Sequence, residues 1–148
     1  MASYTKKSED LLNSKNISIT TPRLILLSLL IKEKRPLTVD QILTLSKGKI
    51  AQSTLYRVVS DLKDFGLITE FTTPDNTIVV EISFIAKGDT NHHHHIFCKD
   101  CGEITDIALS NELEEHLKEE IIQIQKSLKV LIADHTLELY GLCEKCKH

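Results

Sequence analysis

Two C-x-x-C pairs constrain this chain more than any other feature. Its four cysteines all lie after residue 97, at Cys98, Cys101, Cys143 and Cys146. In an intracellular chain such pairs indicate a zinc site before disulfides. A two-residue spacing lets one turn direct two thiolates at one ion, and four thiolates form a closed, structural Zn²⁺ site. A redox dithiol pair is the alternative, although the sequence has no thioredoxin-like context.

The charge of the chain is unevenly distributed. The 148 residues carry a net charge of −3, with eleven Lys/Arg against nine Asp/Glu in residues 1–84 and seven against twelve in residues 85–148. The cation excess lies in the N-terminal part, which weakly favours nucleic-acid contact there. Lys6 and Lys7 have no apolar run behind them, and no apolar run reaches membrane-spanning length. We therefore expect a cytoplasmic protein with no membrane segment.

The N-terminal part reads as helices followed by a hairpin. Thr20 and Pro22 begin an apolar helix that ends before Pro36, and Thr38 caps a short helix closed by Gly48. A third helix has its apolar residues at helical spacing and its predicted cap and stop at Ser53 and Gly66. Strand-like runs follow at 67–71 and 77–83, joined by a Thr-Pro-Asp-Asn turn. This order predicts a winged helix-turn-helix.

The third helix turns polar residues away from its apolar stripe. In that orientation Tyr56 and Arg57 can reach a major groove, where side chains meet base edges and phosphates. The alternative is a winged helix that binds a protein partner. The candidate DNA-contacting residues are Ser53, Thr54, Tyr56 and Arg57.

Four consecutive histidines precede Cys98. In a strand, His93 and His95 share one face while His92 and His94 share the other, so one strand can serve two metal sites. Imidazoles with nearby carboxylates favour iron, manganese or zinc over copper(I). The alternatives are a solvated polar stretch or an accidental tag-like run.

Carboxylates that could complete such sites follow in the sequence. Asp106 ends a short strand that should lie beside the histidine strand. Ser110 or Asn111 then caps a long amphipathic helix with Glu114 near its start. A later strand-like run, DHTLELYGL, contains His135, which either binds metal or packs at the edge of the core.

Enzyme signatures are missing from the sequence. There is no H-E-x-x-H helix and no H-x-E paired with P-C-x-x-C, so neither a metalloprotease nor a zinc deaminase is supported. A four-thiolate site also leaves no open position for a substrate. We expect a protein that is not an enzyme.

In this order, the segments TPRLILL, STLYRVVSDLKDFGLI, HHHHIFCKDCGEITDI and DHTLELYGLCEKC resemble the ferric uptake regulator family along nearly the whole chain. The resemblance implies an α+β homodimer: a winged helix-turn-helix domain (residues 1–84) followed by a small α/β dimerisation domain (residues 85–148). It implies a metal-responsive repressor of uptake genes that binds double-stranded operator DNA. Iron(II) sensing is the first expectation, and zinc, manganese or peroxide sensing are the alternatives. A zinc-binding interaction module without DNA binding is the alternative from another class.

The resemblance also assigns roles to residues. The four cysteines match the ligands of structural Zn²⁺, and Tyr56 and Arg57 match operator-contacting residues. The regulatory site, for Fe²⁺ or another divalent metal, matches Glu81, His93, His95 and Asp106. An additional site matches His92, His94, His135 and a helix glutamate, taken as Glu114 over Glu112 and Glu115.

Two departures from the family pattern affect the regulatory site. Pro36 stands where many members have a histidine, and it has no ligand atom. The spacing between Glu81 and His95 is several residues longer than usual, which leaves Asp89 as a substitute for Glu81.

Overall fold

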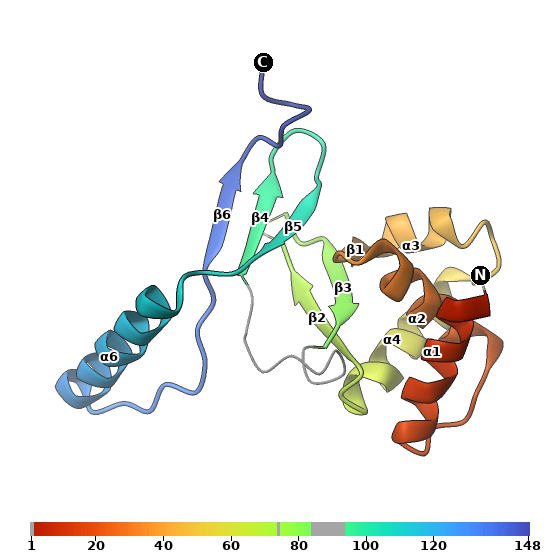
Figure 1. Cartoon of the computed structure of the whole chain (residues 1–148), viewed down its shortest axis with the longest axis horizontal. Coiled ribbons are helices and arrows are strands. Elements are labelled where there is room, and N and C mark those ends of the chain that lie inside the picture. Colours follow the sequence, from red (N-terminus) through yellow and green to blue (C-terminus); the bar gives the residue numbers. More distant parts are fainter. Residues whose placement is uncertain (1, 74, 84–93) are drawn as a thin grey trace. The chain divides into compact units, whose positions relative to one another are not determined.

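The computed structural model describes residues 2–73, 75–83 and 94–148, and the chain divides into two compact units, Met1–Asn91 and His92–His148. Figure 1 shows the order of their helices and strands. The predicted α+β class is confirmed. A boundary between residues 84 and 85 stays a prediction, because residues 84–93 lie outside the described part.

The first unit begins with a helix that the sequence does not predict, α1 (Ala2–Ser14). Its few apolar residues make no clear stripe, but Leu12 is completely buried in the core of the unit. Ser8 Oγ lies 3.0 Å from Ser28 Oγ of helix α2 (Thr21–Glu33). Packing against α2, rather than helix propensity, therefore accounts for α1.

Helix α3 (Val39–Leu45) begins with the cap that the sequence predicts at Thr38. The Gln41 N–H donates to Thr38 Oγ1 at 3.1 Å, and the Thr38 N–H donates to Gln41 Oε1 at 2.9 Å. This reciprocal pair is a capping box, which satisfies backbone donors at the start of the helix.

We expect Thr38→Ala to lower the free energy of unfolding by about 1 kcal/mol, because it removes the side-chain acceptor of the capping box. Thr44→Ala is the matched control, since Thr44 is an exposed residue of the same helix and caps nothing. Urea unfolding of both variants measures the difference. Equal unfolding midpoints would contradict the prediction.

Helix α4 (Gln52–Asp64) begins two residues earlier than a cap at Ser53 requires, so that prediction is wrong. The N-cap is Ala51, with no side-chain cap. Ile50 and Leu55 flank this start and both lie in the buried core, the arrangement of a hydrophobic staple. Apolar packing thus sets the start of α4. Its end matches the prediction, because Gly66 follows with a φ of +74°.

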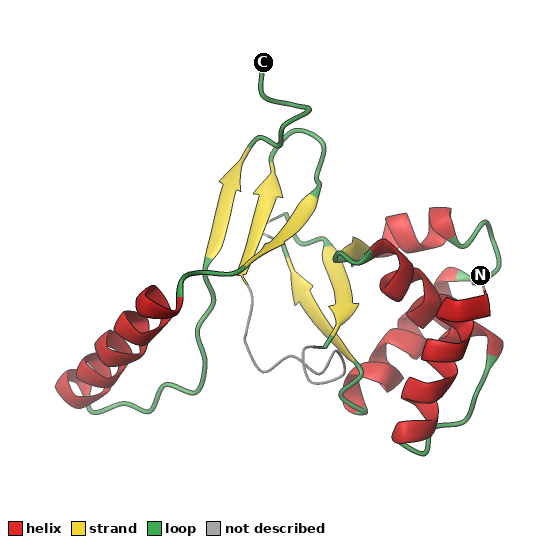
Figure 2. Ribbon diagram, in the orientation of Figure 1, coloured by secondary structure: helices red, strands yellow, loops and turns green. Residues whose placement is uncertain are grey.

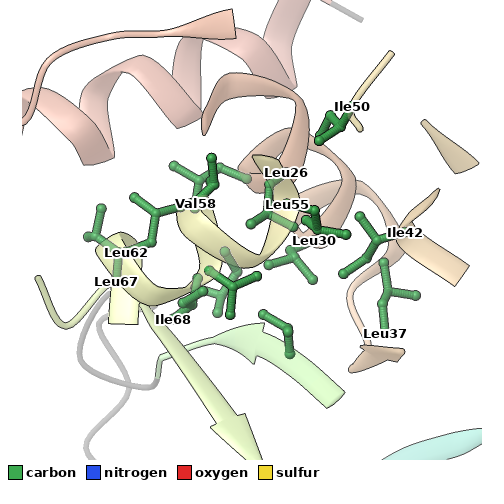
Figure 3. Close-up of a cluster of buried hydrophobic side chains, with 14 of the residues drawn as sticks. Leu26, Leu30, Leu37, Ile42, Ile50, Leu55, Val58, Leu62, Leu67 and Ile68 are labelled. Carbon is green, nitrogen blue, oxygen red and sulfur yellow. The ribbon is translucent and has the colours of Figure 1, made fainter. Parts of the chain in front are cut away.

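Three antiparallel strands complete the winged helix. They are β1 (Leu37–Thr38), β2 (Ile68–Thr72) and β3 (Ile78–Ile82), in the order β1-β3-β2. The sequence predicts the β2–β3 hairpin but not the two-residue β1. Leucines, isoleucines and valines of the helices and the sheet share one core, part of which Figure 3 shows.

The second unit is a three-stranded sheet with one helix. Strand β4 (His94–Cys98) lies between β5 (Ile104–Ile107), which is antiparallel to it, and β6 (Glu138–Gly141), which is parallel to it. Helix α6 (Asn111–Leu128) connects β5 to β6, and Figure 2 shows it extending away from the sheet. The Ser110 side chain caps it by accepting from the Leu113 N–H at 3.3 Å.

This unit has a small core and a large apolar surface. Its buried apolar residues, among those described, are Phe97, Cys98 and Ile104, and no residue of α6 is buried. The chain from α6 to the second cysteine pair instead exposes nine large apolar side chains: Leu113, Ile122, Ile124, Leu128, Val130, Leu131, Leu139, Tyr140 and Leu142. None of the helices in the described part of the chain is both long and apolar enough to span a bilayer.

Candidate metal centres

The structure brings the four cysteines into one cluster. The first pair occupies the turn after β4, where the Gly102 N–H donates to Cys98 O at 3.1 Å. The second pair lies beyond β6, where the Cys146 N–H donates to Cys143 O at 3.0 Å. The Lys99 N–H donates to Gly141 O at 2.8 Å and ties the two turns together.

The geometry of this four-cysteine cluster fits a tetrahedral zinc ion. All four thiols are free, and their sulfurs lie within 4.8 Å of one another. The sulfurs of Cys101 and Cys143 are 3.7 Å apart. Two thiolates bound to one Zn²⁺ at about 2.3 Å are about 3.8 Å apart at the tetrahedral angle.

Backbone polarity prepares one thiol of the cluster for metal binding. The Cys143 N–H donates to Cys98 Sγ at 3.4 Å, and this hydrogen bond, together with smaller effects of the Cys101 and Asp100 backbone, lowers the pKa of the Cys98 thiol to about 6. Thiolates, not thiols, bind metal. The neighbouring sulfur of Cys143 raises the pKa of Cys146 instead. A metal ion bound by the four sulfurs would release their remaining thiol protons.

A second group of metal-ligating side chains lies at the N-terminal end of β4. His94 is almost completely buried, and its Nε2 lies 2.8 Å from Glu114 Oε1 in the first turns of α6. The rings of His94 and His135 have centroids 5.9 Å apart, and the ligand atoms of all three residues lie within 4.8 Å of one another. Two imidazoles and a carboxylate are a common ligand set for divalent first-row metals.

The adjacent histidine takes part in a different group. His95 lies opposite Asp106 in the antiparallel β4–β5 pair, and His95 Nε2 is 3.3 Å from Asp106 Oδ1. Two ligands of one tetrahedral Zn²⁺ at about 2.0–2.1 Å would be about 3.4 Å apart. Strand alternation puts His94 and His95 on opposite faces of the sheet. His92 and His93, predicted for the same two sites, lie outside the described residues.

Glu81 belongs to the first unit. It lies on β3 opposite Thr69 of β2. Its neighbours Val80 and Ile82 pack into the winged-helix core, so alternation places Glu81 on the other face of that sheet. Pro36 is completely buried beside β1.

The outer face of α4 carries the candidate DNA-contacting residues. Tyr56 is 43% exposed, and Ser53 and Arg57 are also exposed, whereas Thr54 is half-buried. The sequence gives no sign of a role for Arg23, but in the structure Arg23 forms an ion pair with Asp61 of α4. No local pattern connects these two residues, because 38 positions separate them.

Known proteins resemble the chain along most of its length. A family model described as the Ferric uptake regulator family matches residues 14–140. The ferric uptake regulation protein of Vibrio anguillarum is 31% identical over 137 residues, which cover 89% of this chain and 85% of that protein. The peroxide-responsive repressor PerR of Staphylococcus aureus is 28% identical, with 92% of this chain and 86% of that protein covered.

The structure agrees with these matches. The crystal structure of the ferric uptake regulator of Vibrio cholerae aligns with a TM-score of 0.68 at 28% identity, over 90% of this chain and 98% of that one. The family model, the relatives and the fold lead to the same conclusion: the chain belongs to the ferric uptake regulator family.

Proposed function

We propose that this protein is a metal-responsive transcription repressor that binds double-stranded operator DNA as a homodimer. The observation that carries the proposal is the combination of two units in one chain. One unit is a winged helix with an exposed polar face on α4, and the other holds a four-cysteine cluster and two His/carboxylate groups on opposite faces of β4. A closed thiolate site stabilises a fold, whereas His/carboxylate sites can exchange their metal.

Each group of ligands has its own role in this proposal. The four cysteines hold structural Zn²⁺. His95 and Asp106 belong to the regulatory site, together with His93 and Glu81 on the strength of the family resemblance. His94, Glu114 and His135 belong to the additional site, together with His92. A regulatory metal can favour the DNA-binding state only through a higher affinity for that state.

The exposed face of α4 supports DNA recognition. Arg57 can donate two parallel hydrogen bonds to a guanine edge, and Tyr56 can contact a thymine methyl group or a phosphate. Ser53 and Thr54 complete the predicted contacts at the start of the helix. A dimer presents two such helices to two half-sites, so the operator should be palindromic.

The apolar surface of the second unit supports a homodimer. The nine exposed apolar side chains on and after α6 lie outside the small core that the described residues of this unit form. Exposed apolar surface on this scale marks an interaction site. A second copy of the chain would cover these residues with the same residues of its own α6 and β6.

Iron(II) is the metal that we propose for the regulatory site. The ligands proposed for this site are imidazoles and carboxylates, with no thiolate among them. Such ligands favour iron(II) or manganese(II), although affinity alone does not separate the divalent metals. Zinc, manganese or peroxide sensing remain the alternatives, and Pro36 removes a ligand that many members of the family use.

Metal content and DNA affinity, measured on one purified sample, test the proposal. The DNA probe is a duplex selected from a random library by the metal-loaded protein. We expect about one tightly held zinc per chain, and DNA affinity that rises when iron(II) is added without oxygen. A larger rise with manganese(II) or zinc(II) would reassign the metal. Tight zinc without DNA binding under any metal would instead support an interaction module.

A further inference from the structure

The two cations of α4 have different surroundings. Lys63 Nζ lies 3.7 Å from Glu70 Oε2 on β2, so an acidic neighbour offsets its charge. Arg57 is exposed and has no ion pair with any residue that the structure describes. Arg57 is therefore the cation of this helix that is free to meet a DNA phosphate or base.

A potential competitor for Arg57 lies one helical turn away. Asp61 is four residues after Arg57 on the same helix, a spacing at which an arginine and an aspartate can form an ion pair. Asp61 is instead bound by Arg23 of α2, whose Nη2 lies 3.2 Å from Asp61 Oδ2. The aspartate is 49% exposed at its side chain, so burial does not keep it from Arg57.

The Arg23 guanidinium also binds Ser18, through the nitrogen that does not contact Asp61. Its Nη1 donates to Ser18 O at 2.8 Å and to Ser18 Oγ at 2.6 Å. The Arg23 side chain is only 15% exposed. A planar guanidinium with three such partners is well fixed, and its small exposure leaves little of it for a DNA phosphate.

We propose that Arg23 is a positioning residue for operator binding, which holds Asp61 away from Arg57 and neutralises its charge. Without Arg23, the Asp61 carboxylate would pair with Arg57 and would place an unbalanced negative charge beside the DNA backbone. Both effects weaken DNA binding. The inference rests on the proposed function, because it requires α4 to contact DNA.

The test compares Arg23→Gln, Asp61→Asn and the double variant, each loaded with metal and titrated against the duplex selected by the native protein. We expect Arg23→Gln to weaken binding by about tenfold for a dimer with two such helices. Asp61→Asn should bind at least as well as the native protein, because it removes the competitor. The double variant should return to the affinity of Asp61→Asn, although the Arg23–Asp61 pair is still absent.

Asp64→Asn in the Arg23→Gln background is the matched control. It removes the same charge from the same helix, but Asp64 is seven residues from Arg57 and should not restore affinity. Thermal unfolding of the same variants tests whether regained DNA affinity merely reflects regained stability. The double variant should be no more stable than Arg23→Gln, although it binds DNA more tightly.

The outcomes separate this inference from the proposed function. If Arg23 only ties α2 to α4, both single variants and the double variant weaken binding alike, which overturns the inference. Unchanged affinity in Arg23→Gln also overturns it. If the native protein selects no duplex with any metal, DNA binding itself fails.

Discussion

Replacing Cys143 with serine is expected to release the zinc and to unfold the His92–His148 unit while the Met1–Asn91 unit stays folded. The second unit buries little apolar surface of its own, with Phe97, Cys98 and Ile104 as its buried apolar residues among those described. Structural zinc contributes about 10–16 kcal/mol in zinc-finger peptides, and that binding energy is folding energy. A unit of this size with so small a core needs a further source of stability, such as a structural metal or oligomerisation.

The loss should be visible by two independent measurements. Elemental analysis should find no zinc in Cys143→Ser, and hydrogen–deuterium exchange should show lost protection in β4 and β6 with α2 and α4 unchanged. Lys145→Ser is the matched control, because Lys145 lies between the cysteines of the second pair and is exposed. A Cys143→Ser protein that keeps protected β4 amides would show that packing or dimerisation, and not zinc, holds the unit together.

Local signals explain why the winged helix could be predicted from the sequence. Pro36, Thr38 and Gly66 act on the residues next to them, so the ends of α2 and α4 and the start of α3 follow from the sequence. The start of α4 depends instead on how Ile50 and Leu55 pack, and the prediction of a cap at Ser53 failed there. Helix α1 was not predicted for the same reason: it is stabilised by packing against α2, and no local sequence signal reports that packing.

The metal ligands show the same division between local and distant information. The period of a strand places His94 and His95 on opposite faces, whatever surrounds them. Sequence alone left Glu112, Glu114 and Glu115 as candidates, and only the path of the chain into α6 puts Glu114 2.8 Å from His94. The strand predicted over DHTLELYGL is shorter in the structure, since β6 begins at Glu138 and His135 precedes it. The contact between Arg23 and Asp61 needs the packing of α2 against α4 and has no local signal.

Replacing His95 with alanine is expected to remove the metal dependence of DNA binding without unfolding the protein. His95 is partly exposed and lies beside Asp106 of the edge strand β5, so its removal should disturb packing less than removal of the buried His94. Changes behind the direct ligands of a metal weaken its binding by about 10–100-fold, and loss of a ligand should exceed that. The zinc content and the thermal unfolding midpoint should stay at their native values. Anisotropy titrations of the selected duplex, with and without iron(II), measure the effect.

Two other histidines make this test specific. His116→Ala removes an exposed imidazole from α6 and should change nothing, because its side chain is 68% exposed. His94→Ala should act through stability, because it removes a buried ring that contacts both Glu114 and His135. The two variants should therefore differ. His95→Ala should lose metal-dependent DNA binding and keep the native unfolding midpoint, whereas His94→Ala should have a lowered unfolding midpoint. If His95→Ala retains full iron-dependent DNA affinity, His95 is not a ligand of the regulatory metal, and the pair of His95 with Asp106 is not the basis of that site.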